Sequence, residues 1–296
     1  MKSIHLGCLL LTLLCVASIV QAKVIHEERS LYRNILIDEK ANVRCMRFVV
    51  HNRGGTHNQS CKDLNEPRRL VFDYAQKVMM GLLLKPEPKS ILIVGLGGGS
   101  LPMAFHELLP NAVITSVEID PAVTRAAKAY FDYQENDFVR TETADARVFI
   151  KRAMFRKQQW DWIILDAFNG DYIPEHLMTM EFFQEVKSVL APGGLVTANT
   201  FSTSRLYDHE STTYQASFKN LLILKSSKGN RVIFAAEQPL IFPIQESYLA
   251  QWQQRLQPYD VNIKRLLNDQ AVPDWDTQAR VLTDQYAPAN ILKHAQ

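Results

Sequence analysis

The sequence predicts an α/β protein in which helices cover both faces of a mainly parallel β-sheet, preceded by a small β domain. From Ser90 onward, short apolar runs alternate with segments of helical spacing, which is the pattern of successive β-α-β units. Residues 221–237 form two strand-like runs around Gly229, which indicates an antiparallel hairpin at the end of the sheet. Residues 23–66 contain only short strand-like runs between turn-like clusters.

The composition supports a large packed core and argues against one class of partner. Hydrophobic residues make up 47% of the 296 residues and charged residues 22%, so wholesale disorder is not expected. The formal net charge is +2 and no basic run stands out, so nucleic acid is not expected as a partner.

The first 22 residues differ from the rest and predict a secretory signal peptide. Lys2 gives a positive start, Leu6–Val20 is apolar but short for a membrane span, and small residues end at Ala22. An uncleaved membrane anchor is the alternative. In both cases the positive start stays inside and the body is exported, so we expect a periplasmic or secreted protein.

The β domain is expected at residues 23–66, with strands at residues 33–39, at residues 43–50 and around Cys61. A hairpin that turns at residues 52–54 pairs residues whose numbers sum to 106, as those of Cys45 and Cys61 do. An oxidising compartment favours a disulfide between them, with two unrelated buried thiols as the alternative.

The main domain is expected at residues 67–296. Its first helix is indicated by apolar residues at helical spacing, namely Leu70, Val71, Tyr74, Val78 and Leu82. Strands are then expected at Ile91–Val94, Val113–Val117, Val139–Thr143, Trp162–Leu165 and Leu195–Asn199. The intervening helices are expected at Leu101–Leu109, Ala122–Phe131, Ala146–Met154 and Met180–Leu190. With the closing hairpin, this order is typical of a Rossmann-like, class I methyltransferase-type sheet more than of a dinucleotide dehydrogenase.

Three alternating glycines follow the first strand of this sheet, at Gly95, Gly97 and Gly99. The dinucleotide fingerprint requires glycine at the first, third and sixth positions, and the sixth position is Ser100. The alternating spacing fits better a nucleoside without a pyrophosphate, because glycine lets the backbone approach the ribose and sulfonium side. A plain glycine-rich turn is the alternative.

Acidic residues follow the next three strands. Glu118 lies about 20 positions after the loop, where a carboxylate can accept hydrogen bonds from both ribose hydroxyls. Asp120, which precedes Pro121, is expected to cap a helix. Asp145 can cap its helix or bind an adenine amino group, and the sequence leaves both roles open. Asp166 ends an apolar strand at the carboxyl edge of the sheet, where open α/β sheets place their chemistry.

Together these motifs resemble the spermidine synthase family of aminopropyltransferases, in its spermidine synthase-like bacterial branch. The matching segments are ILIVGLGGGSL, SVEIDPAV, TADARVFI and WDWIILDAFNGDYIPEHLMTMEFFQEVKSVLAPGGLVTANTF, with RSLYRNILI as a weaker match. The likeness covers most of residues 25–240, and the order of the motifs makes it more specific than the glycine loop alone. It implies a methyltransferase-type domain that binds decarboxylated S-adenosylmethionine or a relative.

By position, the resemblance implies that Glu118 holds the ribose, Asp145 the adenine, and that Pro174 lines the adenine pocket. It also implies that the protein acts in polyamine biosynthesis and that Asp166 is the catalytic aspartate. In that reaction a primary amine attacks the carbon next to a sulfonium, and the carboxylate orients the amine and takes its proton. The acceptor would be a small amine or a polyamine, and family members often form homodimers. The sequence has no histidine or cysteine cluster with metal-ligand spacing, so no metal is expected.

The sequence departs from the family pattern in the part of the site that binds the amine. Gly98 stands where the family has an aspartate, and Asn169 where it has a second acidic residue. Arg33 replaces the glutamine of a Tyr-Gln pair, and residues 74–76 read Tyr-Ala-Gln instead of Tyr-His-Glu. Since polyamine sites are built from carboxylates, the polyamine acceptor is not fixed by the sequence.

Two other functions fit the same pocket. The first is a methyltransferase that uses S-adenosylmethionine. The second is a non-catalytic exported protein that binds a nucleoside or a polyamine, which is in keeping with export because adenosyl donors are made in the cytosol.

Overall fold

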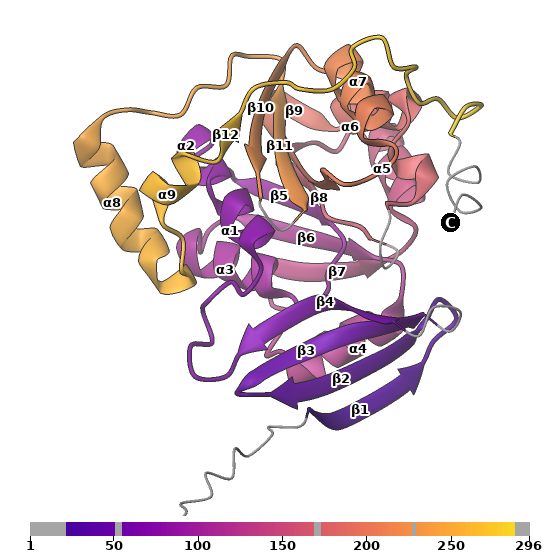
Figure 1. The fold of residues 1–296 in the computed structure, drawn as a ribbon, viewed down its shortest axis with the longest axis vertical. Helices are drawn as coiled ribbons and strands as arrows, with labels where there is room; N and C mark the ends of the chain where they lie inside the picture. Colours follow the sequence, from indigo (N-terminus) through magenta and orange to yellow (C-terminus); the bar gives the residue numbers. More distant parts are fainter. Residues whose placement is uncertain (1–21, 51–54, 169–172, 227–228, 288–296) are drawn as a thin grey trace, which may run out of the picture.

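The computed structural model describes residues 22–50, 55–168, 173–226 and 229–287, which form two β-sheets with helices around the larger one (Figure 1). The smaller sheet has four antiparallel strands, and the larger sheet has eight mainly parallel strands. The predicted α/β class with an N-terminal β domain is therefore confirmed. Apart from Ala22, the expected signal peptide lies outside the described residues. Within the described ranges, no helix is long and apolar enough to span a membrane.

The N-terminal sheet is a meander in which each strand pairs with the next. Its strands are Lys23–Arg29 (β1), Asn34–Lys40 (β2), Val43–Val50 (β3) and Gly55–Asp63 (β4). Cys45 lies opposite Cys61 and forms a disulfide with it, as predicted. The predicted register holds only on this side of a bulge at Gln59. Beyond the bulge, Phe48 pairs with His57, so paired numbers sum to 105 rather than 106. The expected turn at residues 52–54 lies outside the described residues.

The main sheet has the strand order β12-β10-β11-β9-β8-β5-β6-β7. Its parallel part consists of Ser90–Val94 (β5), Val113–Glu118 (β6), Val139–Thr143 (β7), Trp160–Leu165 (β8) and Leu190–Phe201 (β9). The antiparallel part consists of Asn220–Lys225 (β10), Asn230–Ala236 (β11) and Gln270–Ala271 (β12). The antiparallel hairpin β10–β11 therefore lies beside β9, as the sequence predicted.

Helices cover both faces of the main sheet. The helices are Asp73–Met79 (α1), Gly81–Leu84 (α2), Ser100–Leu108 (α3), Pro121–Tyr130 (α4), Ala146–Phe155 (α5), Met180–Ser188 (α6), Tyr207–Ser217 (α7), Glu246–Leu256 (α8) and Ile263–Leu267 (α9). Two short 3-10 helices are Glu175–Leu177 (η1) and Gln257–Tyr259 (η2). The single helix expected around residues 70–82 is thus two short helices, and the helix expected to reach Leu190 ends at Ser188.

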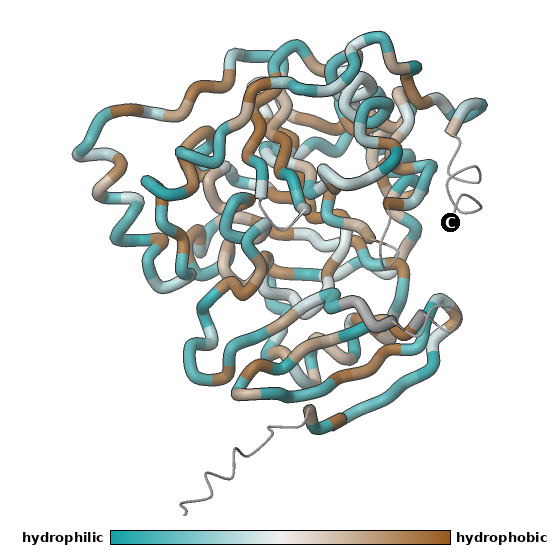
Figure 2. The backbone as a smooth tube through the Cα atoms, viewed as in Figure 1, coloured by the Kyte–Doolittle hydropathy of each residue, from teal (hydrophilic) through white to brown (hydrophobic). Residues whose placement is uncertain are grey.

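The central strands are apolar on both sides because each face of the sheet is buried under helices. In β5, Ile91 and Ile93 face the core under α1 and α3, whereas Leu92 and Val94 face the core under α5 and α6. Figure 2 shows hydrophobic residues along the strands at the centre of this sheet. These strands therefore form a rigid base for the loops at their carboxyl ends.

A third core joins the two sheets through α4. Ile35, Ile37 and Met46 of the N-terminal sheet pack against Ala122 and Val123 of α4. This contact brings β4 close to the loop that follows β5, so the N-terminal sheet forms one wall of the site described next.

Candidate active site

A cavity of about 290 Å³ lies at the carboxyl ends of β5, β6, β7 and β8 and is closed on one side by the N-terminal sheet. Its volume is at the lower end of the range for small-molecule sites. The predicted site residues that line it are Gly95, Gly97, Glu118, Asp145, Asp166 and Pro174. The structure therefore brings three predicted acidic residues from neighbouring strand ends into a single cavity. Gly99 is not among the lining residues, so its expected place in the cavity wall is not observed.

Gly95 is required where the loop after β5 passes the end of β8. Its φ is +103°, which favours glycine, and a Cβ atom there would lie 2.4 Å from the carbonyl oxygen of Asp166. Gly99 has a different role: it precedes α3, and a Cβ atom there would meet the ring of Tyr133 at 2.6 Å. The glycines thus serve close packing of the loop as much as contact with a ligand.

Gly98 stands where the family pattern has an aspartate, and the structure leaves no room for a side chain there. A Cβ atom at Gly98 would lie 2.7 Å from Oγ of Ser60 and 2.9 Å from the ring of Phe131. Ser60 comes from β4 and also lines the cavity. Ser60 of the N-terminal sheet and Phe131 at the end of α4 therefore occupy the space that a carboxylate would need.

Glu118 connects the loops that follow β5 and β6. One carboxylate oxygen accepts a hydrogen bond from the backbone N–H of Leu96 at 3.1 Å, and the other accepts from that of Asp120 at 3.0 Å. Burial raises the pKa of Glu118 to about 7, although these two bonds favour the charged form. Each oxygen can accept a further bond, as a pair of vicinal hydroxyls would require. Asp120 caps α4 through the N–H of Ala122, as predicted.

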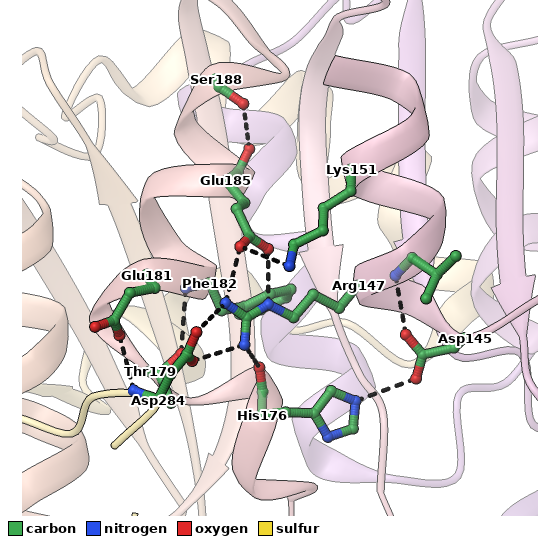
Figure 3. A network of polar contacts seen from close by, with 11 residues as sticks. Asp145, Arg147, Lys151, His176, Thr179, Glu181, Phe182, Glu185, Ser188 and Asp284 are labelled. Atoms are coloured by element: carbon green, nitrogen blue, oxygen red, sulfur yellow. Dashed lines mark hydrogen bonds and ion pairs between the residues drawn. The ribbon is translucent and has the colours of Figure 1, made fainter. Parts of the chain in front are cut away.

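Asp145 both caps a helix and contacts a cavity side chain. Its Oδ1 accepts from the N–H of Val148 in the first turn of α5, and its Oδ2 lies 3.2 Å from Nε2 of His176 (Figure 3). Arg147 of α5 connects η1 to the segment around Asp284, because its guanidinium donates to the carbonyl of His176 and to the Asp284 carboxylate. The two roles left open by the sequence are therefore compatible, since capping uses only one oxygen.

Asp166 follows β8 and is held by two neutral donors. The hydroxyl of Tyr74, from α1, donates to Oδ2 at 3.1 Å, and the amide of Asn199, from β9, donates to Oδ1 at 2.9 Å. Burial raises the pKa of Asp166 to about 7 despite both hydrogen bonds. Burial and, second, the charge of Asp166 raise the pKa of Tyr74 well above its ordinary value, so Tyr74 remains a donor. A carboxylate that titrates near neutral pH suits proton transfer.

Sequence reasoning missed the two partners of Asp166. The sequence places Tyr74 on an apolar helix face and in a segment that partly matches the family pattern, and Asn199 at the end of an apolar strand, but it predicts neither contact with Asp166. A polar atom at the tip of a half-buried aromatic side chain could have pointed to Tyr74. Asn199 lies near the carboxyl end of a strand next to β8, which is the rule that located Asp166.

The other departures from the family pattern lie in different places. Arg33 and Tyr32 line the cavity. Gln76 points away from it, since its amide donates to the carbonyl of Leu70 and accepts from Arg265. Asn169 lies outside the described residues. Within the described part of the chain, no group of three or more His, Cys, Asp or Glu side chains could hold a metal ion.

The fold and the cavity define a class I methyltransferase-type protein with an additional N-terminal β-sheet. The family model described as the spermine/spermidine synthase domain matches residues 73–224. A polyamine aminopropyltransferase of Vibrio vulnificus is 46% identical over 297 residues, which cover 97% of each chain. The chain therefore belongs to the spermine/spermidine synthase family.

Two solved structures agree with this fold. A probable spermidine synthase from Corynebacterium glutamicum superposes with a TM-score of 0.63 at 21% identity, covering 86% of this chain and 98% of that chain. Human methyltransferase-like protein 13, in complex with SAH, superposes with a TM-score of 0.50 at 26% identity, covering 74% and 95%.

Proposed function

We propose that this protein is an aminopropyltransferase that moves an aminopropyl group from decarboxylated S-adenosylmethionine to a small amine. The observation that carries the proposal is the position of Asp166 in the wall of a cavity that also contains Glu118 and Asp145, where burial raises the pKa of Asp166 to about 7. The similarity to the Vibrio vulnificus aminopropyltransferase along nearly the whole chain supports the same reaction.

The order of the strands supports a direction for the bound donor. Across the sheet, β7 ends near Asp145, β6 ends at Glu118, β5 leads into Gly95, and β8 is followed by Asp166. An adenosyl group laid along this edge has its adenine near Asp145, its ribose hydroxyls on Glu118 and its sulfonium over the glycine loop. The carbon next to the sulfonium then faces Asp166, where the acceptor amine would enter.

The reaction needs a proton acceptor but no other chemistry from the protein. The neutral amine uses its lone pair to form a bond to the aminopropyl carbon, and the carbon–sulfur bond breaks. The electron pair of that bond neutralises the sulfonium, so methylthioadenosine leaves as a thioether. An ammonium has no lone pair, so the acceptor must give one proton to a base, and Asp166 is placed to receive it. Tyr74 and Asn199 hold the carboxylate for in-line attack.

The test is a product assay on the purified mature protein. We expect decarboxylated S-adenosylmethionine and putrescine to yield methylthioadenosine and an aminopropylated amine, detected by mass. The matched controls are Asp166→Asn and Asp137→Asn, the latter an exposed carboxylate outside the cavity lining. Absence of both products with every small diamine tried would refute the proposal, as would an Asp166→Asn protein as active as the parent.

One observation favours methyl transfer as a second candidate. Gly98 and Ser60 leave no carboxylate at the position where the family pattern has one, so the pocket has less to repel the carboxylate of ordinary S-adenosylmethionine. Human methyltransferase-like protein 13, which resembles this chain, was solved with SAH. In the same assay, methyl transfer would yield S-adenosylhomocysteine instead of methylthioadenosine.

We also propose that the protein is exported. The apolar N-terminal segment predicts it, and the disulfide between Cys45 and Cys61 supports an oxidising compartment. Cell fractionation should place the protein outside the cytosol, as a shorter mature chain if the signal is cleaved or in the membrane fraction if it is retained. Full-length protein confined to the cytosol would contradict export.

A further inference from the structure

We propose that Asn230 and Asn199 form an amide relay that orients and tunes Asp166, so that Asn230 is a positioning residue without touching the carboxylate. The inference rests on the proposed function for its kinetic consequence. Its structural content, the link from Asn230 to Asp166, does not depend on which reaction the site performs.

The direction of the first amide follows from the carboxylate. An ionised carboxylate only accepts hydrogen bonds, so the Asn199 amide must present its NH₂ group to Oδ1 of Asp166, at 2.9 Å. The side chain of Asn199 is nearly fully buried, at 3% exposed, so water cannot take over this bond. The carbonyl oxygen of the same amide is then directed to the opposite side.

The second amide locks the first. Nδ2 of Asn230 donates to Oδ1 of Asn199 at 3.0 Å, which is the only arrangement that leaves both Asn199 groups satisfied while its NH₂ group faces Asp166. If Asn230 could only accept, Asn199 would gain by rotating its amide through a half-turn. Its carbonyl oxygen would then face Asp166 and disfavour the charged carboxylate.

The strand pairing places the two amides on one face of the sheet. Asn230 opens β11 opposite Phe201 of β9, and Val232 pairs with Asn199. Residues 199 and 201 therefore share a face with residues 230 and 232, and Asn199 and Asn230 are diagonal neighbours. A regular antiparallel ladder fixes their spacing, so the relay is built on rigid strands rather than on a loop.

Few charges compete with the relay for control of Asp166. From α1, Tyr74 contacts it, whereas Asp73 and Lys77 are paired with each other. From β11, Arg231 points to the other face, where it meets Glu210. Elsewhere in the cavity wall lie Glu118 and Asp120 at the end of β6, Asp145 after β7, His176 from η1 and Arg33 near β2. Within the described structure, the hydrogen bonds given to the Asp166 carboxylate come from Tyr74 and Asn199.

Two substitutions at one residue separate the orientation of the amide from the effect of added charge. Asn230→Asp replaces the donor by an acceptor of the same shape, and Asn230→Leu removes the donor without adding charge. Asn220→Asp is the matched control, because Asn220 lies on the neighbouring strand β10 and its side chain donates to the carbonyl of Glu237, away from Asp166. The carboxyl titration of Asp166 is read by ¹³C NMR on ligand-free protein, with the signal assigned by its loss in Asp166→Asn.

In the parent, Asp166 should titrate at about 7. Asn230→Asp should shift that titration upward by about one pH unit, since the ionised form loses a donor, and Asn230→Leu should shift it upward by less. The kcat–pH profile should move by the same amount, with the rate at high pH close to that of the parent. A purely structural role would lower the rate at every pH and leave the midpoint in place.

Unchanged Asp166 titration in both Asn230 variants would overturn the relay, and so would an equal shift in Asn220→Asp. The two proposals fail separately. If no variant or parent forms methylthioadenosine but the titration shifts as expected, the aminopropyltransferase proposal falls and the relay stands. If the parent turns over and neither variant shifts, the relay falls alone.

Discussion

Asp166 is a half-buried carboxylate and Glu210 a fully buried one, and they lie on opposite faces of the strand pair β9–β11 with different partners. On one face of β9 and β11, the amides of Asn199 and Asn230 lead to Asp166. On the other face, Arg231 donates to Glu210 at 3.2 Å, to Thr200 at 2.9 Å and to Ser211 at 2.6 Å. Burial raises the pKa of both carboxyls to about 7.

The difference between the two sites lies in the partners rather than in the carboxylates. Glu210 and Arg231 are 2% and 0% exposed and compensate each other's charge within the core. Such a pair resists replacement of one member but offers nothing to a ligand. Asp166 has neutral donors and faces a cavity, so the positive charge that stabilises its carboxylate can come from a cationic substrate. We conclude that neutral hydrogen bonding leaves a carboxylate available to a ligand, whereas charge pairing gives it a structural role.

The largest effect on catalysis is expected from replacing the reactive carboxylate, Asp166. Asp166→Asn keeps the shape but cannot accept a proton, so kcat should fall by about 10²- to 10⁴-fold. The affinity for methylthioadenosine, measured by calorimetry, should stay close to that of the parent. If the affinity for methylthioadenosine fell as much as kcat, Asp166 would act in binding the nucleoside and not in proton transfer.

At the structural carboxylate, Glu210, we expect a change in the free energy of unfolding rather than in catalysis. Arg231→Met leaves Glu210 buried without its cation, which should lower the free energy of unfolding by about 3–5 kcal/mol. Because the folded-state pKa of Glu210 is raised above 4.5, protonation favours the folded state. The extra loss should therefore be small and constant below about pH 7, where Glu210 is protonated in both folded proteins, and should grow above it. Urea titrations at several pH values measure this, with Arg156→Met as an exposed control.

Glu118 is a third carboxylate to set beside Asp166 and Glu210, and its donors are neutral backbone N–H groups. Glu118→Gln should weaken methylthioadenosine binding by about 10- to 100-fold, the size expected when a charged acceptor is lost. In the parent, affinity should rise as the pH passes through about 7, since ionised Glu118 accepts from the ribose hydroxyls more strongly. Calorimetry at several pH values checks both effects. A parent whose affinity does not vary with pH would remove Glu118 from the nucleoside site.

The smallest effect is expected from one neutral donor of Asp166. Tyr74→Phe removes a single hydrogen bond, so kcat near neutral pH should fall by about 2- to 10-fold. Since that bond favours the ionised carboxylate, the midpoint of the kcat–pH profile should also move to higher pH. A loss as large as that of Asp166→Asn would contradict this secondary role of Tyr74.

Much of this arrangement could be predicted from local patterns. The alternation of apolar strands and amphipathic helices gave the parallel sheet, and the rule that carboxyl ends of strands carry the chemistry located Glu118 and Asp166. The Cys45–Cys61 pair was predicted correctly, although the register used holds only for the pairs on the Cys45 side of the bulge at Gln59. If Gln59 paired with Met46 instead of bulging, the ladder would place Cys45 opposite Ser60, so the bulge is needed for the disulfide.

The remaining features depend on contacts between residues far apart in the chain. Tyr74 meets Asp166 across 92 positions and Asn230 meets Asn199 across 31, and neither contact has a local signal. The block at Gly98 arises from Ser60, which belongs to the other sheet. Helices α7, α8 and α9 were not predicted, and α7 has its buried Glu210 and Thr213 among polar neighbours, which hides the helical period.

The central claim is tested most directly by the rate of methylthioadenosine formation as a function of pH, at saturating decarboxylated S-adenosylmethionine and putrescine. The parent should gain about tenfold per pH unit up to about 7 and then level off, whereas Asp166→Asn should stay low at every pH. A parent that forms no methylthioadenosine, or an Asp166→Asn protein that reproduces the parent's profile, would contradict the account.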